Sequence, residues 1–403
     1  MEIPLAMQGL DSDDLKLVNE VFMSGQHTMG ARVKSFEEEF ANYVGTKYAV
    51  MVNSGSSANL LALEVAARGQ SKKLEGKQGQ YIAVPAVLWP TSLWPIIQLG
   101  YKVLVIDTLA DSLMIDLAKL QKAKFDYGES LVGAVLIHPL GRALNLAMIE
   151  KIKNELNLFV IEDTCESLGS GNHNKHSGTV GDFGTFSFYF SHHITTVEGG
   201  MVVTNNLQDY DDLISMRAHG WTRNRSDKEK IEEKNPQLHR DFLFYTSGYN
   251  FRPMEFQGAL GSSQLKKFPG FLTKRIANAT KIAEEIAGSE FEILDFTEKD
   301  YGRTRHGIPS HSSMALPIKH KNPNTDIRKI MDYLSSKKVA SRPLLAGNTL
   351  HQPAFNHPSV KVYENLENSS TLYKQSFMLG NHHNYNNEQI KKIIEVLRSY
   401  RFK

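Results

Sequence analysis

The sequence has a single cysteine, Cys165, among 403 residues. One cysteine cannot form a disulfide within the chain, and it cannot supply the several thiolates that a zinc cage or an iron–sulfur cluster requires. No stretch approaches the ~18 uninterrupted apolar residues of a membrane-spanning helix. Residues 1–18 carry acidic side chains where a secretory signal has basic and apolar ones. We therefore expect a cytoplasmic protein with no membrane contact and no iron–sulfur cluster.

The sequence also lacks an excess of charge of either sign, since it has 46 basic and 44 acidic side chains and a net charge of +2. Nucleic acids and anionic membranes attract proteins through clustered basic residues, and no long block of Lys or Arg stands out here. We expect small molecules as partners, and no nucleic acid. At ~100–200 residues per domain, the length suits two domains.

Short apolar runs rich in β-branched residues alternate with helical patterns from residue 48 onward. This alternation is typical of βαβ units with a mainly parallel, buried sheet, so the sequence predicts an α/β fold. We expect a large domain over residues 1–265 and a smaller α/β domain over residues 266–403. Residues 224–240 are highly charged and are expected to form an exposed loop or excursion. Strands of the large domain are predicted at Tyr48–Val52, Tyr81–Val84, Val103–Ile106, Val132–His138, Leu158–Glu162, Phe183–Tyr189 and Met201–Thr204.

A turn of small residues, Ser54 to Ser57, lies between the first predicted strand and a predicted helix over Ser56–Arg68. Free amides at a helix N-terminus attract anions, and small side chains let an anion come close. The turn is a candidate phosphate site. A simple helix cap explains the same residues, and the turn alone does not separate the two interpretations.

Acidic residues end the predicted strand Leu158–Glu162. Ligands of parallel α/β sheets bind at the carboxyl ends of the strands, so Asp163 is placed to pair with a protonated ring nitrogen. A solvated acid at a strand end is the alternative. We interpret Cys165 as a small packed residue, because no basic partner is evident beside it.

Two adjacent histidines, His192 and His193, follow an aromatic strand and precede a glycine pair. Imidazole moves protons near neutral pH, so this is a candidate proton-transfer site. Neighbouring residues on an extended chain point to opposite faces, so the two rings are not expected to bind one metal ion. Two hydrogen-bonded histidines in a structural role are the alternative.

In this order and spacing, the three elements resemble the fold-type I, pyridoxal-phosphate-dependent sugar aminotransferases typified by DegT, DnrJ and StrS. The resemblance implies a mainly parallel, mixed sheet of seven strands flanked by helices, a smaller C-terminal domain, and a homodimer whose active sites are shared across the interface. The cofactor-binding residues that it implies are Gly55, Ser56, Ser57 and Ser187 at the phosphate, Trp89 stacked on the ring, Asp163 at the ring nitrogen, Glu166 near the ring, and Asn250 supplied by the second subunit.

The resemblance breaks at one position. Transaminating members carry a lysine that forms a Schiff base with the cofactor, and this chain has His192 there. Imidazole cannot form that bond, so the cofactor, pyridoxal 5′-phosphate (PLP) or its amino form pyridoxamine 5′-phosphate (PMP), is expected to bind non-covalently with His192 as the catalytic residue. The nearest other amine, Lys175, is expected on the surface.

A histidine at this position marks the 3-dehydratases of nucleotide-linked 4-keto-6-deoxysugars, and the motif Arg217–Asn224 strengthens this resemblance. It implies removal of the C3 hydroxyl of GDP-4-keto-6-deoxy-D-mannose, with L-glutamate restoring PMP, as in the synthesis of colitose-type dideoxysugars of lipopolysaccharide O-antigens. A nucleotide-sugar aminotransferase and a catalytically inactive cofactor-binding relative are the alternatives. Candidate substrate-binding residues are Met29, His219, Arg252 and His382.

Overall fold

The computed structural model describes residues 1–295, 307–345 and 348–402. Its largest element is an eight-stranded sheet in the order β1-β9-β8-β5-β4-β2-β3-β13. Strands from β8 to β13 in this order are parallel, whereas β9 is antiparallel to both β8 and β1. The expected mainly parallel, mixed sheet is confirmed. Its strands are β1 (Tyr48–Val52), β2 (Tyr81–Pro85), β3 (Lys102–Ile106), β4 (Leu131–Ile137), β5 (Phe159–Asp163), β8 (Phe183–Ser187), β9 (Gly200–Thr204) and β13 (Val360–Val362).

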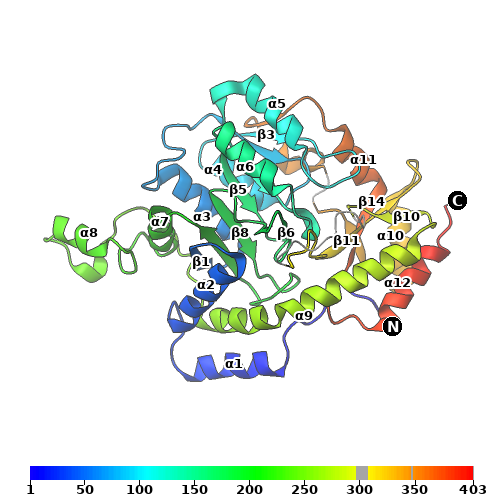
Figure 1. Ribbon diagram of the computed structural model, residues 1–403, viewed down its shortest axis with the longest axis horizontal. Coiled ribbons are helices and arrows are strands. Elements are labelled where there is room, and N and C mark those ends of the chain that lie inside the picture. The colour runs from blue at the N-terminus through cyan, green and yellow to red at the C-terminus, as the bar shows by residue number, and fades with distance from the viewer. Residues whose placement is uncertain (296–306, 346–347, 403) are drawn as a thin grey trace.

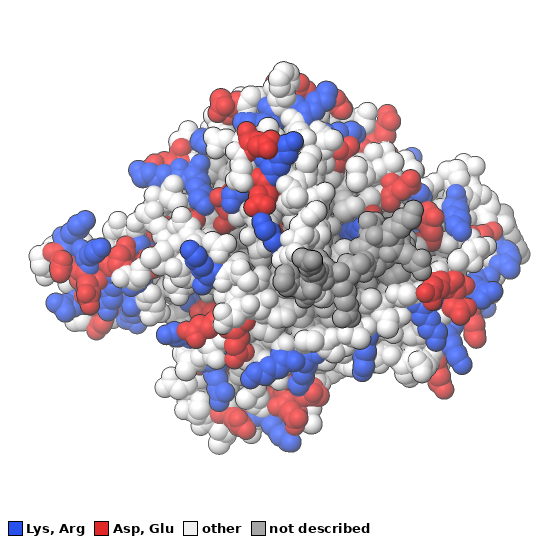
Figure 2. All heavy atoms as spheres, in the orientation of Figure 1, with Lys and Arg blue, Asp and Glu red and all other residues white. Residues whose placement is uncertain are grey.

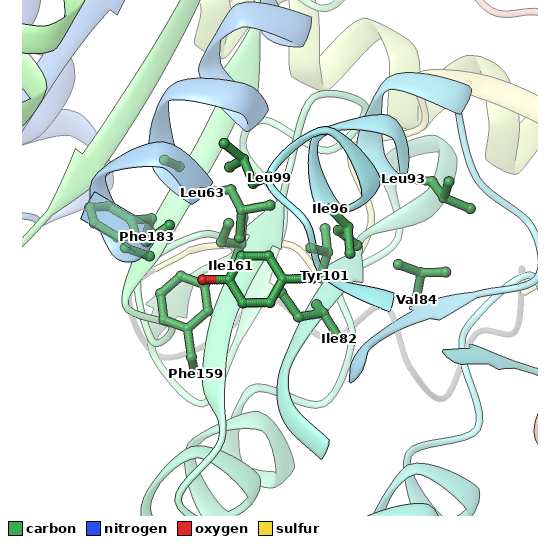
Figure 3. Close-up of a cluster of buried hydrophobic side chains, with 14 of the residues drawn as sticks. Leu63, Ile82, Val84, Leu93, Ile96, Leu99, Tyr101, Phe159, Ile161 and Phe183 are labelled. Carbon is green, nitrogen blue, oxygen red and sulfur yellow. The ribbon is translucent and has the colours of Figure 1, made fainter. Parts of the chain in front are cut away.

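Helices cover both faces of this sheet (Figure 1). They are α2 (Ala31–Val44), α3 (Gly55–Arg68), α4 (Trp94–Gln98), α5 (Leu117–Tyr127), α6 (Leu146–Glu155), α7 (Leu207–Arg217) and the first part of α9 (Glu255–Ile286), and α1 (Ser12–Met23) packs on the outside of α9. Successive strand residues point to opposite faces. On β3, Val103 and Val105 join the core under α3 and α4, whereas Leu104 and Ile106 join the core under α5 and α6. Figure 3 shows the first of these cores around Tyr101.

One strand of the sheet was not expected. The sequence predicts seven strands, but β13, from the C-terminal third of the chain, pairs in parallel with β3 and adds an eighth at the sheet edge. Its three residues, Val360–Val362, are too short for a periodic pattern to reveal. The pairing places part of the segment assigned to the small domain in the large sheet.

Helix α9 continues through the gap in its predicted pattern and ends at Ile286 instead of Glu290. The sequence shows one long helix pattern in two stretches, 255–267 and 273–290, and the gap between them contains Pro269, whose missing amide disfavours a continuous helix. The structure has one helix of 32 residues with Pro269 inside it. Phe268 beside the proline is fully buried, and α9 packs along both α1 and α2, so tertiary contacts hold the helix through the proline.

The charged segment 224–240 leaves the body of the protein as predicted, but it contains a short helix, α8 (Lys228–Lys234), which projects at the left of Figure 1. Within this helix the side chain of Ile231 is buried, and Lys228 forms an ion pair with Glu232 one turn later, at 3.5 Å. One apolar anchor and one ion pair at this spacing give the helix its local support.

A second, four-stranded sheet in the order β10-β11-β14-β12 forms the C-terminal part. The end of α9 packs over it together with two later helices, α10 and α12, and Ile3 from the N-terminus joins the same core. The domain boundary predicted after residue 265 falls within α9 and stays a prediction. The remaining elements are β6 (Gly171–Asn172), β7 (Lys175–His176), β10 (Phe291–Ile293), β11 (Ala315–His320), α10 (Ile327–Ser336), β12 (Ser341–Pro343), α11 (Glu367–Gln375), β14 (Ser376–Gly380) and α12 (Asn387–Ser399).

Charges of both signs are interspersed over the face shown in Figure 2, and neither sign forms a continuous patch there. This matches the near balance of acidic and basic residues in the sequence. In the described part of the chain, no helix combines the length and the apolar character needed to cross a membrane.

Candidate active site

A cavity of about 280 Å³ lies where the carboxyl ends of β5 and β8 meet the turns that follow β1 and β2. This is the edge of a parallel sheet at which α/β proteins bind ligands. The volume is at the low end of the ~300–1,000 Å³ typical of small-molecule sites. The cavity brings together most of the cofactor-binding residues predicted from sequence, namely Gly55, Ser56, Trp89, Asp163, Glu166, Ser187 and the catalytic candidate His192.

The N-terminus of α3 forms one wall of the cavity. Ser54 caps the helix, because its Oγ accepts a hydrogen bond from the Ser57 amide at 3.1 Å. Among the residues that the structure describes, the amides of Gly55 and Ser56 have no acceptor. Both residues line the cavity, so the cap and the candidate anion site coexist at this helix end. Ser57 is turned toward the cap and does not line the cavity.

Asp163, the last residue of β5, is buried and accepts three hydrogen bonds. Its Oδ2 accepts from Asn59 Nδ2 at 2.8 Å and from Ser92 Oγ at 2.7 Å, and its Oδ1 accepts from the Cys165 amide at 3.1 Å. The interpretation of Asp163 as a solvated strand-end acid is therefore wrong. The carboxylate is a fixed acceptor at the floor of the cavity.

His192 lies in the loop after β8 and is half-buried. Its Nδ1 is 2.7 Å from the carbonyl oxygen of Cys165. A carbonyl only accepts, so Nδ1 carries the proton and Nε2 keeps its lone pair. Burial lowers the pKa of His192 to about 4 against the opposing effect of this hydrogen bond, and the charge of Arg275 adds to the lowering. His192 is therefore a neutral imidazole at neutral pH, with a basic nitrogen available.

Glu166 lines the same cavity, and its pKa is shifted upward, whereas the pKa of His192 is shifted downward. Burial raises its pKa to about 7, although a hydrogen bond from the Leu140 amide, 3.0 Å long, opposes the shift. Near neutral pH a large fraction of Glu166 carries a proton. A neutral base and a protonated carboxyl group in one site are a common arrangement for acid–base chemistry.

Arg275 from α9 is fully buried behind His192. Its guanidinium donates to three main-chain carbonyls, those of His192 at 3.2 Å, Met314 at 3.0 Å and Asn381. These contacts tie the His192 loop to the C-terminal sheet. His193 is also buried, and its Nε2 donates to the carbonyl oxygen of Ser312 at 3.2 Å, so this ring has a structural role behind His192.

The remaining predicted residues lie outside this cavity. Asn250 is exposed and its Oδ1 accepts from Arg252 Nε at 2.9 Å. His219 stacks edge-on against Trp221, and Met29 lies in a turn with φ of 42°. His382 is buried beside His383. Lys175 lies on the surface, as expected, and pairs with Glu150 at 2.9 Å.

Several cavity residues were missed by the sequence analysis. Arg342 comes from β12, and Met314 precedes β11, both in the C-terminal sheet, whereas Asn59 lies one helical turn into α3. Glu198 adds a third carboxyl group to the cavity, besides Asp163 and Glu166. No local pattern distinguishes these residues, because only the fold brings them to the sheet edge. In the described ranges, no cluster of three or more His, Cys, Asp or Glu could hold a metal ion.

Known proteins are similar to this chain in both sequence and fold. A curated relative, GDP-4-keto-6-deoxy-D-mannose 3-dehydratase of Escherichia coli O55:H7, is 36% identical over 98% of this chain and 99% of its own length. A solved structure of the E. coli enzyme with bound hydrated PLP has a TM-score of 0.90 and 34% identity, covering 98% of this chain and 99% of that one. A structure of such an enzyme with a trapped PLP–glutamate geminal diamine has a TM-score of 0.89 and 34% identity, covering 98% and 100%.

The family model described as the DegT/DnrJ/EryC1/StrS aminotransferase family matches residues 8–398. That match spans both sheets and every residue of the cavity, and it agrees with the family suggested by the three sequence elements. The chain belongs to the DegT/DnrJ/EryC1/StrS aminotransferase family.

Proposed function

We propose that this chain is a PLP-dependent 3-dehydratase of a nucleotide-linked 4-keto-6-deoxyhexose, with GDP-4-keto-6-deoxy-D-mannose as the substrate and L-glutamate as the amino donor. The observation that carries the proposal is His192, an imidazole with a free Nε2, in the position where transaminating relatives have a lysine. The relatives described above carry the names of this reaction, and one of them was trapped with glutamate.

The cavity suits PLP in three respects. Two amides without acceptors at the start of α3 offer a phosphate site, and Gly55, Ser56 and Ser187 line the cavity there, whereas the predicted contact from Ser57 is absent from its lining. Asp163 offers a carboxylate to the ring nitrogen, and Glu166 lies close by. Trp89 is 52% exposed at the cavity and can cover a ring face. The volume fits a cofactor better than a whole nucleotide sugar, so the nucleotide is expected to extend beyond the mouth.

Gly55→Ala tests the phosphate cradle. A Cβ at this position would lie 2.6 Å from Ser187 Cβ and 3.0 Å from Cys165 Sγ, so α3 must shift away from β8. We expect PLP affinity to fall at least tenfold and stability to fall by about 1–3 kcal/mol, as in overpacked cores. Fluorescence titration with PLP measures the first and urea unfolding the second. Gly270→Ala is the matched control, because a Cβ there meets nothing within 4 Å; equal PLP affinity in both variants would contradict the cradle.

His192 and Glu166 of this chain share the proton transfers that the proposed reaction needs. When bound, PMP supplies an electron sink that makes a neighbouring carbon-bound hydrogen acidic. His192 Nε2 takes that proton and returns one to the departing C3 hydroxyl, and the Cys165 carbonyl holds the ring in the required tautomer. Glu166, protonated near pH 7, is a second proton reservoir in the same cavity. Arg342 supplies a cation for a carboxylate of glutamate.

We also propose a homodimer in which Asn250 reaches the partner's site. In this chain Asn250 lies outside the cavity, as do Met29, His219 and Arg252. Phe244, 50% exposed, stacks on Trp221, and Trp221 contacts both His219 and Arg252; Phe242 in the same segment is 64% exposed. Clustered exposed apolar surface of this kind is typical of protein interfaces. A dimer would complete each cavity with these residues and supply contacts to the nucleotide.

The function is tested with purified enzyme, PLP, L-glutamate and GDP-4-keto-6-deoxy-D-mannose. We expect release of ammonia and a sugar product that has lost its C3 oxygen, measured by an ammonia assay and mass spectrometry. A stable amino sugar without ammonia would instead identify an aminotransferase. Failure to bind PLP would identify a catalytically inactive relative.

A further inference from the structure

Asp163 belongs to a buried chain of hydrogen bonds that begins on a different strand. Thr185 Oγ1, on β8, is 2.6 Å from Asn59 Oδ1, and Asn59 Nδ2, on α3, is 2.8 Å from Asp163 Oδ2. Ser92, after β2, reaches the same oxygen at 2.7 Å. Thr185 and Ser92 are buried to 2% exposure or less, and Asn59 is 5% exposed. Three other segments, β8, α3 and the turn after β2, are thus linked to this one carboxylate on β5.

The direction of each hydrogen bond in this chain is fixed by charge. A carboxylate only accepts, so Asn59 must turn its NH₂ group toward Asp163 and its carbonyl oxygen toward Thr185. The Thr185 hydroxyl then has to donate. A flipped Asn59 amide would place two oxygens against each other. Thr185 therefore sets the orientation of the Asn59 amide, and that orientation lets Asp163 accept a hydrogen bond from the Asn59 NH₂ group.

The number of acceptor sites is also informative. An ionised carboxylate offers about four lone-pair sites. Asn59, Ser92 and the Cys165 amide occupy three of them, and Asp163 lines the cavity with what remains. All three partners donate, and a donated hydrogen bond stabilises the ionised carboxylate more than it stabilises the protonated carboxyl group. One acceptor site is left for a group that donates from the cavity.

We propose that Asn59, Ser92 and Thr185 are positioning residues that act through Asp163 and keep a shared proton on the cofactor's ring nitrogen instead of on the carboxyl group. The inference rests on the proposed function, since it assumes PLP with its ring nitrogen at Asp163. A ring nitrogen that carries the proton is a stronger electron sink than one that only accepts a hydrogen bond. The donors thereby set the strength of the sink without touching the reacting atoms.

The test uses PLP labelled with ¹⁵N in its ring, bound to the full-length protein, and reads the ring-nitrogen chemical shift, which distinguishes a protonated nitrogen from an unprotonated one. Thr185→Val and Ser92→Ala each remove one hydroxyl with little change in volume. We expect both to move the signal from the protonated position toward the unprotonated one, and the double variant to move it further. In kinetics, each single variant should lower kcat at least tenfold with little change in KM for the sugar.

The reference and control variants separate the possible outcomes. Asp163→Asn removes the carboxylate and should give the unprotonated signal. Thr204→Val is the matched control, because Thr204 lies on neighbouring β9 and its hydroxyl donates to the Asp182 carbonyl, 3.2 Å away, and not to a carboxylate. It should leave the signal unchanged. If Asp163→Asn shifts the signal and Thr185→Val and Ser92→Ala do not, the positioning role is overturned and the cofactor assignment stands. If Asp163→Asn also leaves the signal unchanged, the proposed contact of Asp163 with PLP fails, and the positioning role with it.

Discussion

His192→Lys is expected to abolish dehydration and to attach the cofactor covalently to the protein. A lysine here places a primary amine where Nε2 of the imidazole now faces the cavity, and an amine bonds to the cofactor aldehyde, which an imidazole cannot do. Loss of a general acid–base group costs a factor of ~10²–10⁴ in rate, and occupation of the aldehyde adds to that loss. Borohydride reduction followed by mass spectrometry of the denatured protein measures the attachment.

His192→Gln is the matched control for this experiment. Glutamine also removes the base but carries no reactive amine, so we expect the same loss of dehydration with PLP bound and no covalent attachment. PLP affinity should stay within a few-fold of the parent, because the cradle at α3 and the carboxylate of Asp163 are unchanged. If His192→Lys binds PLP without attachment, His192 does not lie beside the cofactor aldehyde, and its proposed role fails.

The protein is expected to lose stability steeply as the pH falls below about 6.5. Six histidines have lowered pKa values, each mainly through burial: about 4 for His176 and His192, about 3 for His311 and His382, about 2 for His383, and well below the usual value for His193. In the unfolded chain a histidine titrates near ~6.5. Between that pH and the folded values, the unfolded state binds protons that the folded state does not.

The sign follows from proton linkage. Stability rises with pH wherever the unfolded state binds more protons, by about 1.4 kcal/mol per pH unit for each such proton. Lowering the pH from 7 to 5 therefore favours unfolding. Glu166 works in the opposite direction, because its pKa is raised to about 7 and it binds a proton in the folded state. It offsets about one histidine, so about five uncompensated protons remain, and we expect stability to fall by several kcal/mol over these two pH units.

Urea unfolding followed by circular dichroism between pH 7.5 and 5 measures this loss. The midpoint should fall while the slope with urea stays constant, which shows that the same structure unfolds. His383→Gln should flatten the pH dependence by up to one proton, because His383 stacks on Phe271 with ring centroids 3.8 Å apart and burial there lowers the pKa of its ring to about 2. A midpoint that does not change across this pH range would show that these histidines are protonated in the folded state.

The sequence predicts the parts of the site that lie within one strand-and-turn unit. Asp163 ends a strand, Gly55 and His192 each follow one, and the patterns of these strands point to the sheet edge. Arg342 and Met314 could not be predicted in this way, because they reach the cavity from the second sheet, which packs there only in the folded chain. The same holds for Thr185, whose role depends on Asn59 from another segment.

The elements of the fold also divide into those that their own sequence predicts and those that depend on neighbouring elements. Buried strands with continuous apolar runs were predicted to within about one or two residues, because burial on both faces leaves a strong signal. The continuity of α9 through Pro269 and the three-residue β13 were not predicted. In both cases neighbouring elements decide the outcome: α1 and α2 support the helix, and β3 supplies the partner that a short strand needs.

The position of β13 has a consequence for how the protein is made in a cell. A ribosome completes β3 at residue 106 but does not reach β13 until residue 360. At ~5–20 residues per second, the edge of the growing sheet stays uncovered for roughly 10–50 s. An open strand edge is a template for pairing with other chains, so nascent or truncated chains are the form most exposed to aggregation. A three-residue strand near the end of the chain thus covers the edge of β3, long after the other strands of the sheet were synthesised.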